Sequence, residues 1–113
     1  MKSYTDINQS KKLTEFLPHE SADMCYLLPY EDEDKPLLEQ GGFGSTPCWS
    51  LVALLGILPT IDDEFEPQLH RSLDKYRCTY EGEEDSSGLW RVADNPVDAC
   101  YEMIIKLNEL NLL

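Results

Sequence analysis

The stretch "STPCWSL", residues 45–51, contains the residue types best suited to covalent chemistry. The dipeptide Thr46-Pro47 predicts a helix start, with Thr46 as N-cap and Pro47 at the first helical position. Cys48 would then lie in the first turn, where the helix amides lower the pKa of a thiol and favour the thiolate. A thiol-dependent enzyme that uses Cys48 is therefore one functional hypothesis.

Several features of the sequence weaken this hypothesis. The dipeptide Cys48-Trp49 resembles the papain-like proteases superficially, but the chain is too short for such an enzyme, and the glutamine and glycine signature before the cysteine is absent. Only His19 and His70 could serve as a base. A free cysteine on an apolar helix is usually a small core residue. We expect Cys48 to pack in the core, and we assign no catalytic residue.

The sequence also lacks the patterns of metal and nucleotide sites. Structural zinc requires ligands in close pairs, whereas the cysteines are spread along the whole chain. The runs "EDED" at 31–34 and "EGEED" at 81–85 lack the alternating oxygens and the glycine of a calcium loop, and "GGFG" at 41–44 does not follow a strand and open a helix. We expect no metal and no cofactor. The four cysteines are Cys25, Cys48, Cys78 and Cys100.

The charge of the chain restricts its partners. Nine Lys and Arg against 22 Asp and Glu give a net charge of −13. Phosphate backbones and anionic membranes repel such a surface, so we expect no direct nucleic-acid binding and no membrane binding. Abundant carboxylates also keep a small protein soluble. Alternatively, they imitate a phosphate backbone toward a nucleic-acid-processing protein, which would require carboxylates gathered on one face.

Two tryptophans are the candidate interaction residues. Trp49 lies beside the predicted helix start, and Trp90 lies in a predicted strand. Burial in the core is the default expectation for both residues. A contiguous exposed apolar patch centred on either would indicate a protein partner or a dimer. The sequence does not distinguish a monomer from a dimer.

The elements of the first half alternate with loops. A helix is expected from Thr5 or Asp6 to just before Pro18, and the apolar run at 24–30 predicts a strand. Residues 31–46 have the charges, proline and glycines of a loop. A second helix follows to residue 58, and because it is apolar nearly all round we expect it to be central.

The second half has clearer patterns. Alternation in residues 76–80, with flanking apolar residues at 69–73 and 89–92, predicts an antiparallel three-stranded meander. Asn95 and Pro96 then begin a helix with apolar residues at helical spacing, which should dock across the meander. The expected order is α-β-α-β-β-β-α, with the three-stranded antiparallel meander packed against helices. We predict one α+β domain over residues 1–113.

Three segments together resemble a known group of proteins: "YTDINQSKKLTEFLPHESADM" at 4–24, "PCWSLVALLGILP" at 47–59 and "NPVDACYEMIIKLNEL" at 95–110. They are similar to a family of short, acidic, uncharacterised proteins of gut Bacteroidales, their mobile elements and their phages. The resemblance implies a bacterial, cytoplasmic accessory setting. It implies no activity and no catalytic residue.

The N-terminus and the cysteines point to the same compartment. "MKSYTDINQSKKL" lacks the apolar core of a signal peptide, and reduced thiols are typical of the cytoplasm. We therefore expect a non-catalytic cytoplasmic accessory or protein-binding domain with an unknown protein partner. An acidic mimic or inhibitor of a DNA- or RNA-processing protein is the alternative. The thiol enzyme comes third.

Overall fold

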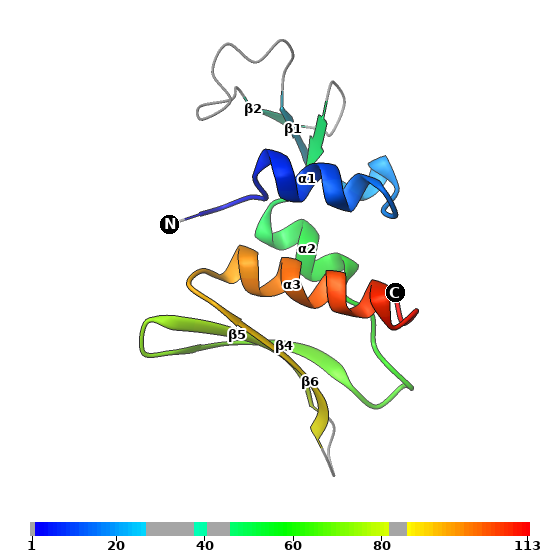
Figure 1. Cartoon of the computed structure of the whole chain (residues 1–113), viewed down its shortest axis with the longest axis vertical. Coiled ribbons are helices and arrows are strands. Elements are labelled where there is room, and N and C mark those ends of the chain that lie inside the picture. The colour runs from blue at the N-terminus through cyan, green and yellow to red at the C-terminus, as the bar shows by residue number, and fades with distance from the viewer. Residues whose placement is uncertain (1, 27–37, 41–45, 82–85) are drawn as a thin grey trace. The chain divides into compact units, whose positions relative to one another are not determined.

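The computed structural model describes residues 2–26, 38–40, 46–81 and 86–113 (Figure 1). These residues form helices and two three-stranded antiparallel sheets, which confirms the predicted α+β class. The elements are α1 (Ile7–Thr14), the 3-10 helix η1 (His19–Ser21), β1 (Met24–Tyr26), β2 (Leu38–Gln40), β3 (Thr46–Cys48), α2 (Leu51–Ile57), β4 (Glu66–Ser72), β5 (Lys75–Glu81), β6 (Ser86–Ala93) and α3 (Pro96–Glu109).

The chain divides into two compact units. One comprises Ser3–Ala53, and the other comprises Met1–Lys2 with Leu54–Leu113. Each unit contains one of the two sheets. The expectation of one domain over residues 1–113 stays a prediction.

Helix α1 of the first unit begins as the sequence predicts. Asp6 is the N-cap, and its carboxylate accepts a hydrogen bond from the Gln9 amide at 2.8 Å. The Gln9 side chain accepts from the Asp6 amide at 3.0 Å and completes a capping box. The helix buries Ser10 and Leu13, so only a narrow side of it packs against the rest of the unit.

The first unit also contains a sheet of very short strands in the order β2-β1-β3. The sequence predicts only its central strand, β1, and residues 27–30 of the strand predicted at 24–30 lie outside the described residues. Strand β3 replaces the expected helix start, because Thr46 and Pro47 remain extended and pair with β1. The predicted loop at 31–46 is therefore wrong where β2 and β3 form. Its remaining residues, 31–37 and 41–45, lie outside the described residues, as do the acidic run at 31–34 and "GGFG".

Helix α2 consequently begins later than the sequence predicts, at Leu51. The hydroxyl of Ser50 accepts a hydrogen bond from the Ala53 amide at 3.3 Å, in the manner of an N-cap. The Ser50 amide in turn donates to the Asp23 carboxylate at 2.9 Å. The capping residue of α2 is therefore Ser50, four residues after the predicted Thr46.

The expectation that this helix is central is also wrong. Within α2 only Leu54 is buried, whereas Val52 is 78% exposed and Leu55 is also exposed. A helix of two turns presents few side chains to any one neighbour, so apolar composition on all sides did not produce burial on all sides.

The second unit contains the predicted meander, with strand order β4-β5-β6. Ser72 pairs with Lys75 across a two-residue turn, and β5 pairs with β6 along nearly its whole length. A register shift between Thr79 and Glu81 interrupts the second pairing. Strands β4 and β6 are the two edges of the sheet, and Pro67 lies in β4.

Helix α3 packs on β5 and β6 and covers one face of this sheet (Figure 1). Asn95 is the N-cap and Pro96 follows at the helix start, as predicted. The helix ends with Asn111 in the left-handed region, at φ 58°, and the Leu112 amide donates to the Leu107 carbonyl at 2.9 Å. This is a Schellman motif with asparagine in the usual place of glycine.

Candidate functional site

Cys48 does not lie in the first turn of a helix. It is fully buried at the end of β3, and burial is the main cause that raises the pKa of its thiol from 9.0 to about 12. The nearby Cys25 and Asp23 raise this pKa further, because both disfavour a second negative charge. A buried, protonated thiol is a poor nucleophile.

The two histidines do not form a catalytic partnership with Cys48 in the described structure. His19 lies exposed at the start of η1 and belongs to the same unit as Cys48, but no hydrogen bond joins the two side chains. His70 lies in β4 of the other unit, where its Nε2 is 3.0 Å from the Gln68 Oε1. Among the described residues of its own unit, Cys48 thus has no histidine hydrogen-bonded to its thiol as a base.

The cysteines instead come together as two buried pairs, one in each unit. Cys25 lies close enough to Cys48 to raise its pKa. In the other unit, a hydrogen bond between Cys78 of β5 and Cys100 of α3 raises the pKa of Cys100 and lowers that of Cys78. All four cysteines are buried and reduced. Among the described residues, no group of three or more His, Cys, Asp or Glu side chains is arranged to hold a metal ion.

Trp49 has a structural position. Its side chain is fully buried, and its indole Nε1 donates to the Ser21 hydroxyl at 3.0 Å. Its backbone amide donates to the Thr5 hydroxyl at 3.1 Å. This residue therefore joins η1, the N-terminal segment and the end of β3 within the first unit, and it offers no surface to a partner.

The hydrogen bonds around Trp49 continue through Thr5. The Thr5 hydroxyl is 2.8 Å from the buried Ser10 hydroxyl, and the Thr5 carbonyl accepts a hydrogen bond from the Tyr26 hydroxyl at 2.6 Å. Every polar atom named here has a partner despite its burial, which satisfies the main condition for polar groups in a core.

Trp90 is in the opposite situation. It is 50% exposed, and its neighbour on the same side of β6, Val92, is 46% exposed. Strand pairing places Trp90 opposite Thr79 and Val92 opposite Arg77. Cys78 lies between Arg77 and Thr79 in β5, so its side chain is on the opposite face of the sheet from theirs and from those of Trp90 and Val92. Because Cys78 is buried with Cys100 of α3, Trp90 and Val92 point away from the face that α3 covers. We call this surface the open sheet face; it comprises Glu66, Gln68, His70, Arg77, Trp90 and Val92.

Arg77 is the cation of the open sheet face. Its guanidinium carbon lies 5.7 Å from the centroid of the Trp90 ring, which is a cation–π contact. Within the described part of the chain it forms no ion pair. Beside it, Thr79 is buried and its hydroxyl donates to the Leu89 carbonyl at 3.1 Å. The Thr79 side chain at the centre of the face is thus held by a hydrogen bond, while the Arg77 guanidinium can still form an ion pair with a partner.

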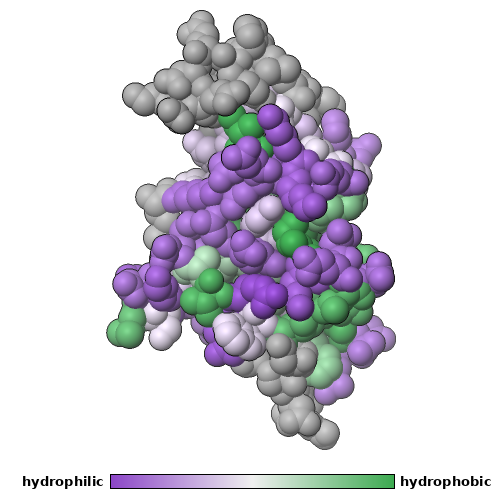
Figure 2. Space-filling model, in the orientation of Figure 1, coloured by the Kyte–Doolittle hydropathy of each residue, from purple (hydrophilic) through white to green (hydrophobic). Residues whose placement is uncertain are grey.

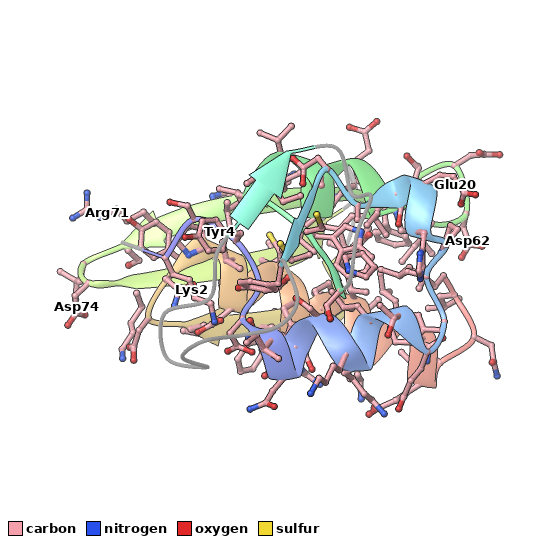
Figure 3. The ribbon with its side chains drawn as sticks, turned by 90° about the horizontal axis from the view of Figure 1, so that it is seen from above. Lys2, Tyr4, Glu20, Asp62, Arg71 and Asp74 are labelled. Carbon is pink, nitrogen blue, oxygen red and sulfur yellow. The ribbon has the colours of Figure 1, made fainter. Side chains whose placement is uncertain are left out.

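The turn between β4 and β5 lies at one end of the open sheet face. Leu73 in this turn has a positive φ of 57° and is 91% exposed, two properties that are unusual for a leucine. Arg71 and Asp74 project from the same end of the hairpin (Figure 3). Lys75 is paired with Asp94, and this hydrogen bond raises the pKa of Lys75.

Charge is unevenly divided along the chain. All three arginines, Arg71, Arg77 and Arg91, lie in the strands of the meander. Several described carboxylates serve as local partners instead: Asp6 caps α1, and Asp23 accepts a hydrogen bond from Ser50.

Hydrophilic residues cover most of the described surface in the view of Figure 2, and hydrophobic residues appear as separate groups. Since the runs at 31–34 and 82–85 lie outside the described residues, the acidic-mimic hypothesis stays a prediction.

The chain matches no protein-family model, no curated protein and no solved structure. Among the described residues, no helix has the length and the apolar character that a membrane span requires.

Of the two tryptophans selected from the sequence, the structure exposes Trp90 and buries Trp49. Sequence reasoning missed Arg77 and Val92. The register of the meander was the signal for both, since residues that alternate with the buried Cys78 must share a face with Trp90.

Proposed function

We propose that the protein is a non-catalytic, cytoplasmic accessory protein that binds another protein through the open sheet face. One observation supports this proposal above all: Trp90 and Val92 are about half exposed on a sheet whose other face is covered by α3. Exposed aromatic residues beside an arginine are typical of the residues that dominate protein–protein binding.

The energetic argument concerns what a partner would cover. Burial of apolar surface contributes roughly 25 cal/mol per Å². A partner that covers the exposed surface of Trp90 and Val92 would therefore gain this free energy on binding. The guanidinium of Arg77 already stacks near the Trp90 ring, so less side-chain entropy would be lost on binding than for two independent side chains.

The experiment is a quantitative capture with matched variants. The protein and its Trp90→Ala and Val92→Ser variants are immobilised and exposed to an extract of the cells that naturally express the protein. We expect at least one protein to be retained by the wild type and lost from both variants. The control is Leu112→Ala, which removes another exposed apolar side chain of the same unit and should leave retention unchanged. Equal retention by wild type and Trp90→Ala would contradict the proposed function.

A further inference from the structure

We propose that the open sheet face binds a second copy of this chain, face to face, as a two-fold symmetric dimer. This inference rests on the proposed function, because it assigns an occupant to the same surface. The argument is the order of charges along the strands, which is complementary to itself when one copy is reversed.

Strand pairing arranges the open sheet face in rows across the sheet. The central row is Gln68, Thr79 and Trp90. The next row toward the β4–β5 turn contains His70, Arg77 and Val92. The next row in the other direction contains the exposed Glu66 of β4, which pairs with Glu81 of β5. A cation and an anion thus stand one row to either side of the central row.

A two-fold axis between two such faces, running across the strands through the central row, reverses the strand direction of the second copy. Trp90 then lies over Trp90 of the second copy. The row of Arg77 lies over the row that contains Glu66 of the second copy. Within these rows Arg77 of β5 faces the Glu81 position of β5, and Glu66 of β4 lies one strand, about 4.8 Å, to the side. The same arrangement occurs twice by symmetry. Packed sheets are about 10 Å apart, a gap that an arginine and a glutamate side chain together span. Each Arg77 can therefore reach the acidic row of the second copy, so the face offers its own copy two symmetric charge contacts around an aromatic centre.

Neither a nucleic acid nor a uniformly charged protein fits this pattern as well. A polyanion would meet Glu66 on the same face as Arg77 and a chain of net charge −13. A uniformly basic partner would meet Arg77 beside the apolar centre. A partner that complements both rows needs an anion opposite Arg77 and a cation opposite the row of Glu66. A second copy in the reversed orientation has its charges in this order.

The size of the face and the net charge predict the strength of the dimer. Three strands about 4.8 Å apart and seven residues long cover roughly 300 Å² per copy. Contacts well below about 1,200 Å² in total belong to weak complexes, so we expect a weak dimer that forms only at high protein concentration. Two chains of −13 also repel one another, and salt screens this repulsion.

The test is an exchange of charges measured by sedimentation equilibrium. Arg77→Glu replaces the cation of the proposed contact by an anion, and Glu66→Arg replaces its anion by a cation. Each variant alone should dimerise at least tenfold more weakly than the wild type. An equimolar mixture should recover the affinity of the wild type, because each chain then faces its complement at both contacts. Trp90→Ala should weaken the dimer at least tenfold, and Leu112→Ala should not change it.

The outcomes separate this inference from the proposed function. A wild type that stays monomeric up to 1 mM, or single variants that dimerise like the wild type, would overturn the dimer. If capture of a different protein still depended on Trp90, the proposed function would stand with another occupant. A mixture that fails to recover dimerisation while both variants are folded by circular dichroism would also overturn the paired arrangement.

Discussion

The two sheets of this protein have the same number of strands but opposite relations to solvent. In β2-β1-β3 each strand has three residues, and consecutive residues such as Cys25 and Tyr26 are both buried. In β4-β5-β6 the strands have seven or eight residues, and the side chains of β4 alternate between half-buried and exposed over most of its length. The described side chains of β1 and β3 are mostly buried on both sides of the first sheet, whereas the second sheet leaves one side exposed.

The two tryptophans express this difference in single residues. Trp49 follows β3 and is enclosed with all its polar atoms paired, while Trp90 lies in the longer sheet and is half exposed. The comparison teaches that an aromatic residue is informative about function only together with the periodicity of its strand.

The largest expected effect is on stability and concerns these two residues. Trp49→Ala should lower the free energy of unfolding by about 3 to 5 kcal/mol, because it removes a large buried side chain and leaves a cavity. Trp90→Ala should lower it by less than about 1 kcal/mol, since the indole is half solvated. Urea unfolding followed by circular dichroism measures both. An equal loss of unfolding free energy in the two variants would contradict the distinction between the buried Trp49 and the half-exposed Trp90.

Alkaline pH should weaken the enclosed region through Cys48. Its pKa is about 12 in the folded state against 9.0 ordinarily, so below pH 9 the thiol is protonated in both states and stability is fully present. Above pH 9 the unfolded state loses the proton first, and stability should fall by up to about 1.4 kcal/mol per pH unit until pH 12.

The measurement is urea unfolding at intervals between pH 8 and pH 11. Cys48→Ala is the matched variant, and its stability should fall less steeply with pH than that of the wild type. Iodoacetamide should label Cys48 slowly in the folded protein and rapidly in urea. Fast labelling of the folded protein near neutral pH would show an accessible thiolate and revive the thiol-enzyme hypothesis.

A smaller effect is expected from the hydrogen bonds around Thr5. Tyr26→Phe removes the hydroxyl that donates to the Thr5 carbonyl, so it should lower the free energy of unfolding by about 1 to 2 kcal/mol. Tyr4→Phe is the control, since Tyr4 contacts the Tyr26 ring edge-on but is less buried. If the two variants lost the same free energy, the buried hydrogen bond of the Tyr26 hydroxyl would contribute no more to stability than the hydroxyl of Tyr4.

The smallest expected effect has the opposite sign. Leu73→Gly should raise the free energy of unfolding by about 0.5 to 1 kcal/mol, because glycine adopts the positive φ of this turn without strain. The β4–β5 turn should thus tolerate the removal of the exposed Leu73 side chain. Thermal unfolding of Leu73→Gly beside Leu73→Ala measures the effect, and a destabilised glycine variant would mean that the leucine contacts something in the folded chain.

The sequence predicted most of the second unit because its signals are local and regular. Asn95 and Pro96 mark a helix start in almost any context, and the alternation around Cys78 has the period of a half-covered sheet. These patterns placed β5 and α3 at nearly their observed bounds, whereas β4 and β6 begin three residues before the expected ranges 69–73 and 89–92.

The same reasoning failed around β3 because tertiary pairing outweighed local preference. Thr46 and Pro47 suit the start of a helix, but their pairing with β1 holds them extended, and Ser50 takes over the capping role. The open sheet face was recoverable only in part: Trp90 was selected by residue type, whereas Arg77 and Val92 required the register.

Pro67 gives the two edges of the longer sheet different properties in concentrated solution. A proline in an edge strand hinders the addition of another strand, since it has no amide hydrogen to donate. Strand β6, the other edge, contains no proline. Uncontrolled growth of the sheet into fibres would therefore begin at β6, and a proline or lysine introduced there should extend the shelf life of the purified protein.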